Sequence, residues 1–297
     1  TEKMEIAKRH LIPKQLEKHG LKKCQLTIAD EAIVELIRGY THEAGVRELE
    51  RETAAVCRKV AMDIGSGKTR VRVGKQKLAA YLGAPKYTHG AIDAINEIGL
   101  ANGLAWTSFG GETLQIEVQI VPGSGQVILT GKLGDVMQES AKAALTFIKA
   151  HAEEFGITLP LDKKDIHLHV PEGAVPKDGP SAGITIMTAM LSALSGIPAR
   201  ADTAMTGEIT LRGRVLEIGG LREKLLAAYR AGIRRVLIPK ANEKDLSDVP
   251  DEVKANMEII GVASAFDVIP LALEHRPQKA ANAFIPQHAH TGAAAAQ

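Results

Sequence analysis

The sequence predicts a small, mostly helical domain at residues 1–84, followed by an α/β domain at residues 96–277. Apolar residues recur every three or four positions before about residue 65, which is the period of an amphipathic helix. From about Gly103, short runs of alternating apolar residues are separated by helical runs, which is typical of an α/β domain. Residues 85–95 predict a linker, and residues 278–297, rich in Ala, His and Gln, are predicted to be disordered.

The helical domain is expected to contain a Ser/Thr-x-x-Asp/Glu helix start at Thr27. The segment Gly65-Ser-Gly-Lys-Thr69 resembles the end of a phosphate-binding P-loop, but Met62 stands at the position where the motif requires its first glycine. A P-loop also follows a strand and opens a helix, whereas this segment follows a predicted helix and opens a strand, so we reject it. The expected elements are helices at about 6–20, from 27–31 onward and at about 46–65, a strand at 71–73 and a segment at 78–82.

In the α/β domain, strands at 113–121 and 126–130 are expected to form a hairpin around Pro122-Gly-Ser-Gly125. The remaining expected elements are a helix from about 133, a strand at 165–170, a helix from Ser181, extended segments at 204–211 and 215–218, a helix at 221–231, strands at 236–239 and 257–262, and a helix at about 265–275.

Composition excludes several function classes. A net charge of +2 and only 3% aromatic residues argue against a dedicated nucleic-acid-binding surface. The two cysteines, Cys24 and Cys57, lack a CxxC spacing and are expected to be reduced thiols in a cytosolic protein. No run reaches the roughly 18 apolar residues of a membrane span, and the charged start is not that of a signal peptide.

Ser181 lies where a proline- and glycine-rich loop becomes a helix. The first N–H groups of a helix have no internal partner and carry partial positive charge, so an oxyanion forming beside Ser181 would find donors there. The turn at Gly179 and Pro180 would hold the hydroxyl out of the helix, and Gly183 would leave room for a substrate backbone. The structural alternative is that Ser181 is only the N-cap of the helix.

A serine nucleophile needs a base, and the sequence offers two kinds. His167 and His169 precede Ser181 on one face of a predicted strand. That they face solvent is a simpler interpretation than that either is the base or a metal ligand. Lys224 lies on a face of the 221–231 helix with small apolar residues, where burial would favour the neutral amine. The alternative is a lysine whose amine extends along the surface into water.

Several segments together resemble the proteolytic domain of the Lon family of ATP-dependent serine proteases. They are Pro176-Lys-Asp-Gly-Pro-Ser-Ala-Gly183, Gly219-Gly-Leu-Arg-Glu-Lys-Leu-Leu226, Gly103-Leu-Ala-Trp-Thr107, Thr130-Gly-Lys-Leu-Gly-Asp-Val-Met-Gln-Glu-Ser140 and Thr206-Gly-Glu-Ile-Thr210. The resemblance covers residues 1 to 277 and implies a helical AAA+ lid subdomain followed by an α/β proteolytic domain with a mixed sheet. It implies that Ser181 is the nucleophile of a serine endopeptidase and Lys224 its general base.

The same resemblance assigns supporting roles. It implies that Thr206 accepts a hydrogen bond from the lysine, that Asp178 engages the lysine in inactive arrangements, and that His167, His169 and Glu117 surround the site. The oxyanion would be held by the backbone around Gly179, Pro180 and Ala182. The simpler alternatives are that Thr206 is an ordinary β-branched strand residue and Asp178 a turn former.

Residues 39–47 resemble the sensor-2 segment of an AAA+ module, so Arg47 is expected to reach the γ-phosphate of ATP. The alternative is a surface ion pair with Glu43. Since these residues contain no P-loop, we expect no ATP hydrolysis by them alone and no cofactor for the peptidase chemistry; ATP and Mg²⁺ are implied for the full-length protein only. The resemblance further implies a hexameric ring that degrades unfolded or damaged proteins in a bacterial cytoplasm.

Two other functions stay open at this point. The first is an assembly or effector-binding module whose dyad is held apart. The second is a nucleotide-binding switch, which the missing P-loop disfavours. DNA binding by the full-length protein is possible but is not indicated by these residues.

Overall fold

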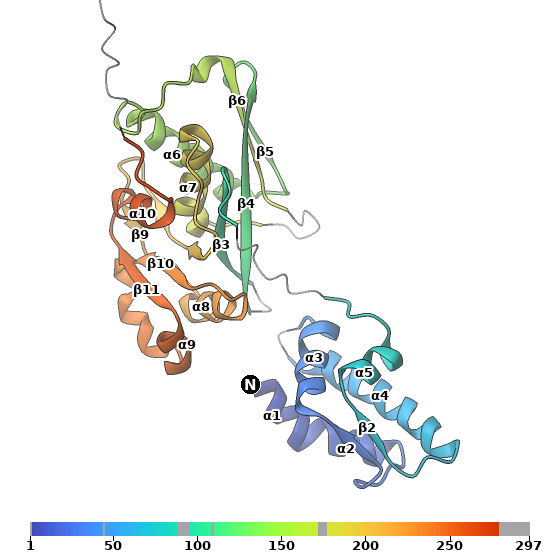
Figure 1. Cartoon of the computed structure of the whole chain (residues 1–297). Helices are drawn as coiled ribbons and strands as arrows, with labels where there is room; N and C mark the ends of the chain where they lie inside the picture. Colours follow the sequence, from blue (N-terminus) through green and yellow to red (C-terminus); the bar gives the residue numbers. More distant parts are fainter. Residues whose placement is uncertain (1, 44, 88–94, 108–109, 172–176, 279–297) are drawn as a thin grey trace, which may run out of the picture. The chain divides into compact units, whose positions relative to one another are not determined.

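The computed structural model describes residues 2–43, 45–87, 95–107, 110–171 and 177–278 (Figure 1). The chain divides into two compact units. The first contains Thr1–Asp93, Ala105–Thr113 and Gly220–Ile233, and the second contains Ala94–Leu104, Leu114–Gly219 and Arg234–Gln297. No helix in the described residues is both long and apolar enough to cross a bilayer.

The first unit has a small helical core to which Leu36, Leu49, Val56, Val60 and Leu78 contribute. The amphipathic period predicted this arrangement. Its elements are α1 (Glu2–Ile6), a π-helical turn (Ala7–Leu11), α2 (Ile12–Lys18), β1 (Leu26–Ile28), α3 (Asp30–Tyr40), α4 (Arg47–Gly65), β2 (Val71–Val73), α5 (Lys75–Leu82) and α8 (Leu221–Arg230).

The predicted helix start at Thr27 is wrong. Thr27 lies in β1, opposite Arg72 of the parallel strand β2, and α3 begins at Asp30 without a side-chain cap. The cause is non-local, because Leu26 is buried by pairing with a strand about 45 residues away, as the paired position Val71 shows. The rejected P-loop segment does follow a helix and precede a strand, since α4 ends at Gly65 and β2 begins at Val71.

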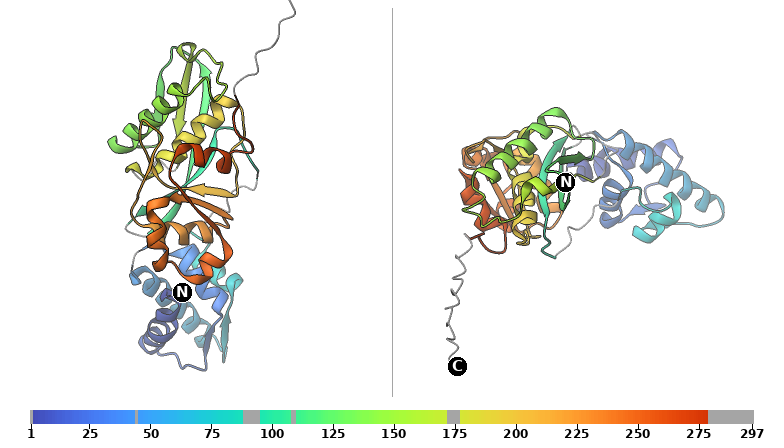
Figure 2. Two further views of the ribbon diagram at one scale, coloured as in Figure 1. Left: turned by 90° about the vertical axis from the view of Figure 1, so that its left-hand side faces the viewer. Right: turned by 90° about the horizontal axis from the view of Figure 1, so that it is seen from above.

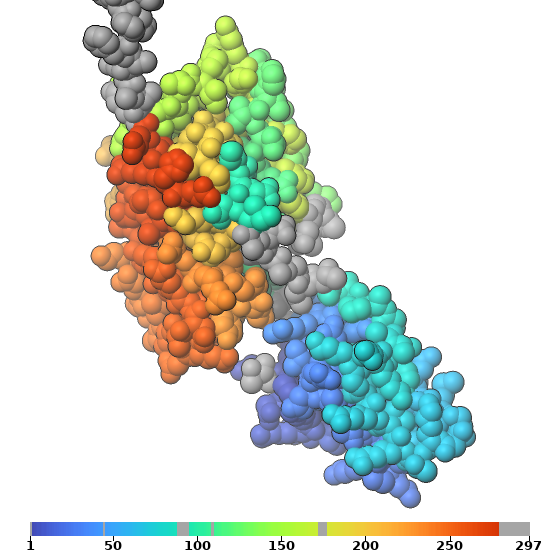
Figure 3. Space-filling view, in the orientation of Figure 1, coloured from blue at the N-terminus to red at the C-terminus, as the bar shows by residue number. Residues whose placement is uncertain are grey.

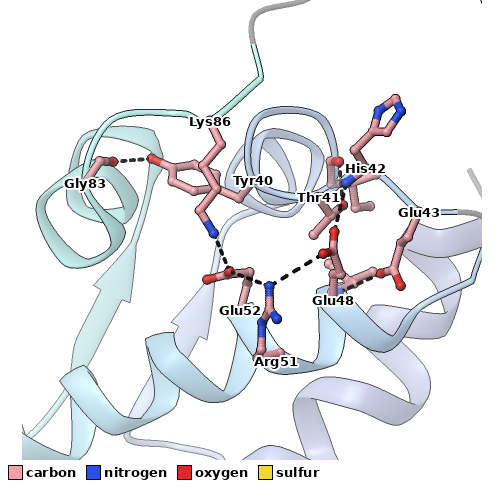
Figure 4. Close-up of polar contacts among 11 residues, drawn as sticks. Tyr40, Thr41, His42, Glu43, Glu48, Arg51, Glu52, Gly83 and Lys86 are labelled. Atoms are coloured by element: carbon pink, nitrogen blue, oxygen red, sulfur yellow. Dashed lines mark hydrogen bonds and ion pairs between the residues drawn. The ribbon is translucent and has the colours of Figure 1, made fainter. Parts of the chain in front are cut away.

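Polar contacts connect α3, α4 and the segment that follows α5 (Figure 4). The Tyr40 hydroxyl donates to the carbonyl of Gly83 at 2.7 Å, and the Lys86 amine lies 2.8 Å from the carboxylate of Glu52. Arg51 lies within 4 Å of both Glu48 and Glu52, at 3.6 and 3.7 Å. The segment that follows α5 is thereby fixed to α3 and α4.

The second unit is built on a mixed seven-stranded sheet, counted over the described residues, with the order β11-β10-β7-β3-β4-β6-β5. The strands β11, β10, β7 and β3 run parallel, whereas β4 pairs antiparallel with β6. Its strands are β3 (Leu100–Thr107), β4 (Gly110–Pro122), β5 (Val127–Thr130), β6 (Lys164–His169), β7 (Thr203–Met205), β10 (Arg235–Pro239) and β11 (Glu258–Val262), and a separate pair is formed by β8 (Glu208–Ile209) and β9 (Val215–Leu216). The end of β3 and the start of β4 belong to the first unit.

Helices α6, α7 and α10 gather on one side of the sheet (Figures 1 and 2). Their apolar residues and those of the sheet form one core. Helix α7 lies within it and is almost wholly shielded from water. Figure 3 shows α10 at the surface of this unit. The helices are α6 (Asp135–Ala150), α7 (Gly183–Ser195), α9 (Asp251–Asn256) and α10 (Ala265–Ala272), with 3₁₀ segments at Leu161–Lys163, Pro180–Ala182 and Lys240–Asp248.

The predicted hairpin of residues 113–121 and 126–130 is wrong, because β6 lies between the two strands. It pairs antiparallel with β4 and parallel with β5. Asp165 at the start of β6 explains the geometry, since its Oδ1 accepts the N–H groups of Ser124 and Gln126, both at 2.8 Å. These bonds lower the pKa of Asp165 and hold the turn around the incoming strand. A Cβ at Gly123 would lie 2.0 Å from the carboxyl carbon, so the turn requires glycine there.

Candidate active site

Ser181 is partly exposed and lies in the 3₁₀ turn Pro180–Ala182, which leads directly into α7. Its carbonyl accepts two hydrogen bonds, from Gly207 N at 2.8 Å and from Thr206 Oγ1 at 3.1 Å. Thr206 is fully buried, so the connection between β7 and β8 fixes the backbone of Ser181. The N-cap position of α7 is occupied by Ala182, so the interpretation of Ser181 as that cap is not supported.

The expectation that Gly183 leaves room for a substrate is wrong. A Cβ at Gly183 would lie 2.8 Å from the backbone nitrogen of Ile209 and 3.0 Å from its Cγ2. Strand β8 therefore fills that space, and glycine at this position permits α7 to pack closely on the chain itself. The sequence could not distinguish the two, because both a substrate backbone and a neighbouring strand require a missing side chain.

Asp178 is exposed and precedes Gly179, whose φ of 125° is a conformation that favours glycine. The Oδ1 of Asp178 accepts the N–H of Gly179 at 2.8 Å and the N–H of Met137 at 3.1 Å. Asp178 thus both forms a local turn and serves as a carboxylate cap for α6. Since Gly179 N–H is used in this contact, it can serve an oxyanion only if Asp178 moves. Pro180 has no N–H and contributes only its fixed φ.

His167, His169 and Glu117 lie on the face of the sheet that carries no helix of the core. Glu117 is paired with His169 across β4 and β6, and it is exposed while both histidines are partly exposed. Thr130 of β5 was not predicted: its Oγ1 lies 3.0 Å from His167 Nε2 and 2.7 Å from His169 Nδ1. Only the parallel pairing of β5 with β6 would have identified it, and that pairing is non-local.

Lys224 lies on α8 in the first unit and is 2% exposed. The alternative of an amine extended into water is therefore excluded. Burial lowers the pKa of Lys224 from 10.5 to about 8, because the charged form loses hydration. On the pKa scale this corresponds to about 3 kcal/mol against the ammonium form.

The first turn of α8 packs tightly against the end of β3 and the start of β4. A Cβ at Gly111 would lie 1.9 Å from the carbonyl oxygen of Glu223, and a Cβ at Gly220 would lie 2.7 Å from Cγ of Trp106. Gly220 also has a φ of 68°, which favours glycine. The structure thus brings Ser181, Thr206 and Asp178 together in the second unit and places Lys224 in the first; the Ser181–Lys224 pair stays a prediction.

Arg47 is the exposed first residue of α4. Glu43, its alternative ion-pair partner, uses Oε1 to accept the N–H of Leu49 at 2.8 Å (Figure 4) and so caps the same helix. The role of Arg47 toward a nucleotide stays a prediction.

Two family models match the chain. The Lon protease (S16) C-terminal proteolytic domain matches residues 72–275, and the Lon protease AAA+ ATPase lid domain matches residues 17–73. The chain is 56% identical to a Lon protease of Nitratidesulfovibrio vulgaris over 277 residues, 92% of this chain and 34% of that protein. The Lon protease of Azospirillum brasilense is 55% identical over 276 residues, 92% of this chain and 34% of that protein.

The Lon protease of Escherichia coli (strain K12) is 53% identical over 279 residues, 93% of this chain and 36% of that protein. The chain spans about a third of the length of these curated relatives. Both family models match in the order in which the helical and α/β regions occur, and together they cover nearly all of the described residues. The chain therefore belongs to the Lon protease family and contains its lid and C-terminal proteolytic domains.

Proposed function

We propose that this chain is a serine endopeptidase in which Ser181 is the nucleophile and Lys224 the general base. The observation that carries the proposal is the burial of Lys224, which lowers the pKa of its amine to about 8. About a tenth of the molecules then have a neutral amine at pH 7, against fewer than one in a thousand for a solvated lysine. A neutral amine near a serine can remove the hydroxyl proton, whereas an ammonium cannot.

Thr206 is proposed to orient that amine. A hydroxyl has one hydrogen, and Thr206 Oγ1 donates it to the carbonyl of Ser181. Toward an amine, Thr206 can therefore act only as an acceptor. Accepting an N–H of Lys224 would direct the nitrogen lone pair, and the same hydroxyl would tie the lysine to the backbone of the nucleophile.

The proposed reaction has two stages. Ser181 Oγ attacks the carbonyl carbon of the scissile peptide while its proton passes to the amine of Lys224, and the backbone N–H groups of Ser181 and Ala182 stabilise the oxyanion. The C–N bond then breaks as the ammonium of Lys224 returns the proton to the leaving amine. In the second stage water attacks the ester carbon of Ser181 while its proton passes to the amine of Lys224. The Oγ–C bond then breaks as the ammonium of Lys224 returns that proton to Ser181 Oγ, which releases the acid product and restores both side chains.

The substitution Ser181→Ala tests this function. It should abolish cleavage of casein and covalent labelling by a peptide boronate, while thermal unfolding stays unchanged. Ser195→Ala is the matched control, because within the described part of the chain the Ser195 hydroxyl bonds at the end of α7 alone, to Leu191 O at 2.7 Å and Ser192 O at 3.5 Å. That control should cleave casein at the wild-type rate, and undiminished turnover by Ser181→Ala would overthrow the assignment.

For the complete protein we propose ATP-dependent degradation of unfolded or damaged proteins by a hexameric ring in the bacterial cytoplasm. The resemblance and the family support this proposal. Binding of ATP and Mg²⁺ would need a P-loop from outside this sequence, since none occurs in the 297 residues. Arg47 is proposed to contact the γ-phosphate from the lid.

One observation favours a second candidate, an assembly or effector-binding module whose dyad is inactive in isolation. The Gly179 N–H, which the resemblance offers as an oxyanion donor, is held by Asp178 Oδ1. This candidate predicts no boronate labelling of the chain although its oligomers are intact, whereas the peptidase predicts labelling that depends on Ser181.

A further inference from the structure

The loop before Ser181 is attached to the amino-terminal turn of α6. Gly134 N donates to the carbonyl of Lys177 at 2.8 Å, and Lys177 N donates to the carbonyl of Lys132 at 3.2 Å. One residue further along the loop, the carboxylate of Asp178 accepts the N–H of Met137 at 3.1 Å. Loop and helix are thus joined by three hydrogen bonds over two consecutive loop residues.

Gly134 shows that the turn is shaped around this carboxylate. Its φ of −69° and ψ of 169° are accessible to any residue, so its backbone does not require glycine. A Cβ at Gly134, however, would lie 2.3 Å from Cγ and 2.5 Å from Oδ2 of Asp178. The side chain is absent here because the carboxylate of another segment occupies its place. A helix N-terminus without a capping side chain of its own favours such an anion.

We propose that the turn at Gly134 and Met137 positions the nucleophile by holding the carboxylate of Asp178. This inference rests on the proposed peptidase function. The Oδ1 that accepts Met137 N–H also accepts Gly179 N–H, and Gly179 is two residues from Ser181. On its other side, Ser181 is held through its carbonyl by Thr206 and Gly207. The nucleophile therefore lies between two anchors, and α6 supplies one of them.

A purely structural cap would make the same contact with α6, and the two roles differ in what they change. A cap contributes to unfolding free energy alone. A positioning contact also changes the turnover number, because a displacement of about 1 Å at a reacting group can cost about 100-fold in rate. It leaves the Michaelis constant nearly unchanged, since the substrate contacts elsewhere are intact.

The test is a double-mutant cycle on Gly134→Ala, Asp178→Ala and the pair, with kcat and KM measured on a fluorogenic peptide. Each single variant should lower kcat by about 10- to 100-fold with KM within twofold. The pair should lose no more than either single variant, because Gly134→Ala acts by expelling the same carboxylate. Asp135→Asn is the matched control: it removes an exposed carboxylate from the same turn and should leave kcat unchanged.

Losses in kcat that multiply in the pair, or singles that shift the melting temperature while kcat and the boronate labelling rate stay at wild-type values, would overturn the inference. Hydrogen exchange gives a readout that does not depend on activity: the amides of Met137 and Gly179 should be protected in the wild type and exchange faster together in both single variants. Wild type that neither cleaves peptide nor labels would instead refute the proposed function, so the two failures are distinguishable.

Discussion

The segment that carries Ser181 and the helix that carries Lys224 are stabilised in different ways. Around Ser181 and along α7, buried polar groups are paired: Thr185 Oγ1 donates to Met205 O at 3.1 Å, and Thr188 Oγ1 donates to Ile184 O at 2.8 Å. On α8, a charged residue type is buried and its pKa is lowered by lost hydration. Hydrogen bonds fix the place of the serine, and exclusion of water determines the charge of the lysine.

This difference separates the consequences of substitution. Removing a partner near α7 leaves a buried polar group unsatisfied, which costs stability. Removing the amine of Lys224 removes a titrating group whose charged form is disfavoured by burial, so it should cost activity and weaken the pH dependence of stability. The predictions below test the two halves of this comparison, beginning with the largest expected effect.

Lys224→Arg should abolish peptide cleavage, by about 1000-fold or more in kcat/KM. The guanidinium stays protonated at any accessible pH and cannot accept the proton of Ser181, although its charge and length are similar. The wild type should gain kcat/KM as pH rises through the lowered pKa of about 8. A Lys224→Arg variant that retains both the rate and this pH profile would show that another group is the base.

Lys224→Met should remove a pH dependence of stability that amounts to about 3 kcal/mol between pH 7 and pH values above 10.5. The amine titrates near 8 in the folded state and near 10.5 when unfolded, so the unfolded state binds more protons between these values. Wild-type stability should therefore rise with pH across this window relative to that of the methionine variant. Urea unfolding of both proteins from pH 7 to 10 measures the difference, and a constant gap would contradict burial as the cause.

The sequence predicts those features of this structure that depend on residues close together in the chain. The period-2 strand before the glycine- and proline-rich loop, the helix after it and the apolar face of the helix that carries Lys224 are all local patterns, and the structure has them. The family motifs added the fold class and the family itself, both of which the comparisons bear out.

The failures share a non-local cause. Asp165 of β6 accepts hydrogen bonds from the turn between β4 and β5, so that β6 lies between these two strands. No pattern within β4 or β5 indicates this. The local pattern at Thr27 predicts a helix start, whereas pairing with β2 places Thr27 in a strand. The contacts of Thr130 with the two histidines, and of Asp178 with α6, join residues about 40 positions apart. A single sequence carries no signal for such pairs.

Gly183→Ala should destabilise the protein by up to about 2 kcal/mol. Alanine favours helices over glycine by about 1 kcal/mol, but its Cβ would lie 2.8 Å from Ile209 N, and overpacking costs about 1 to 3 kcal/mol. Gly65→Ala at the end of α4 is the matched control, because among the described residues no atom beyond its chain neighbours and its own helix backbone lies within 4 Å of its Cβ position. Urea unfolding should give opposite signs for the two variants; a stabilised Gly183→Ala would show that β8 yields easily.

Ser192→Ala tests the hydrogen-bonded half of the comparison alone and should cost about 1 to 2 kcal/mol. Ser192 is fully buried; its Oγ donates to Ile197 O at 2.6 Å and accepts the N–H of Gly99 at 2.9 Å. Alanine would leave that buried N–H and carbonyl unsatisfied. Ser195→Ala, three residues later and partly exposed, removes bonds to two carbonyls of its own helix and should cost less than about 0.5 kcal/mol. Equal losses in urea unfolding would mean that the hydroxyls of α7 do not fix its place, and that apolar packing positions Ser181 as well.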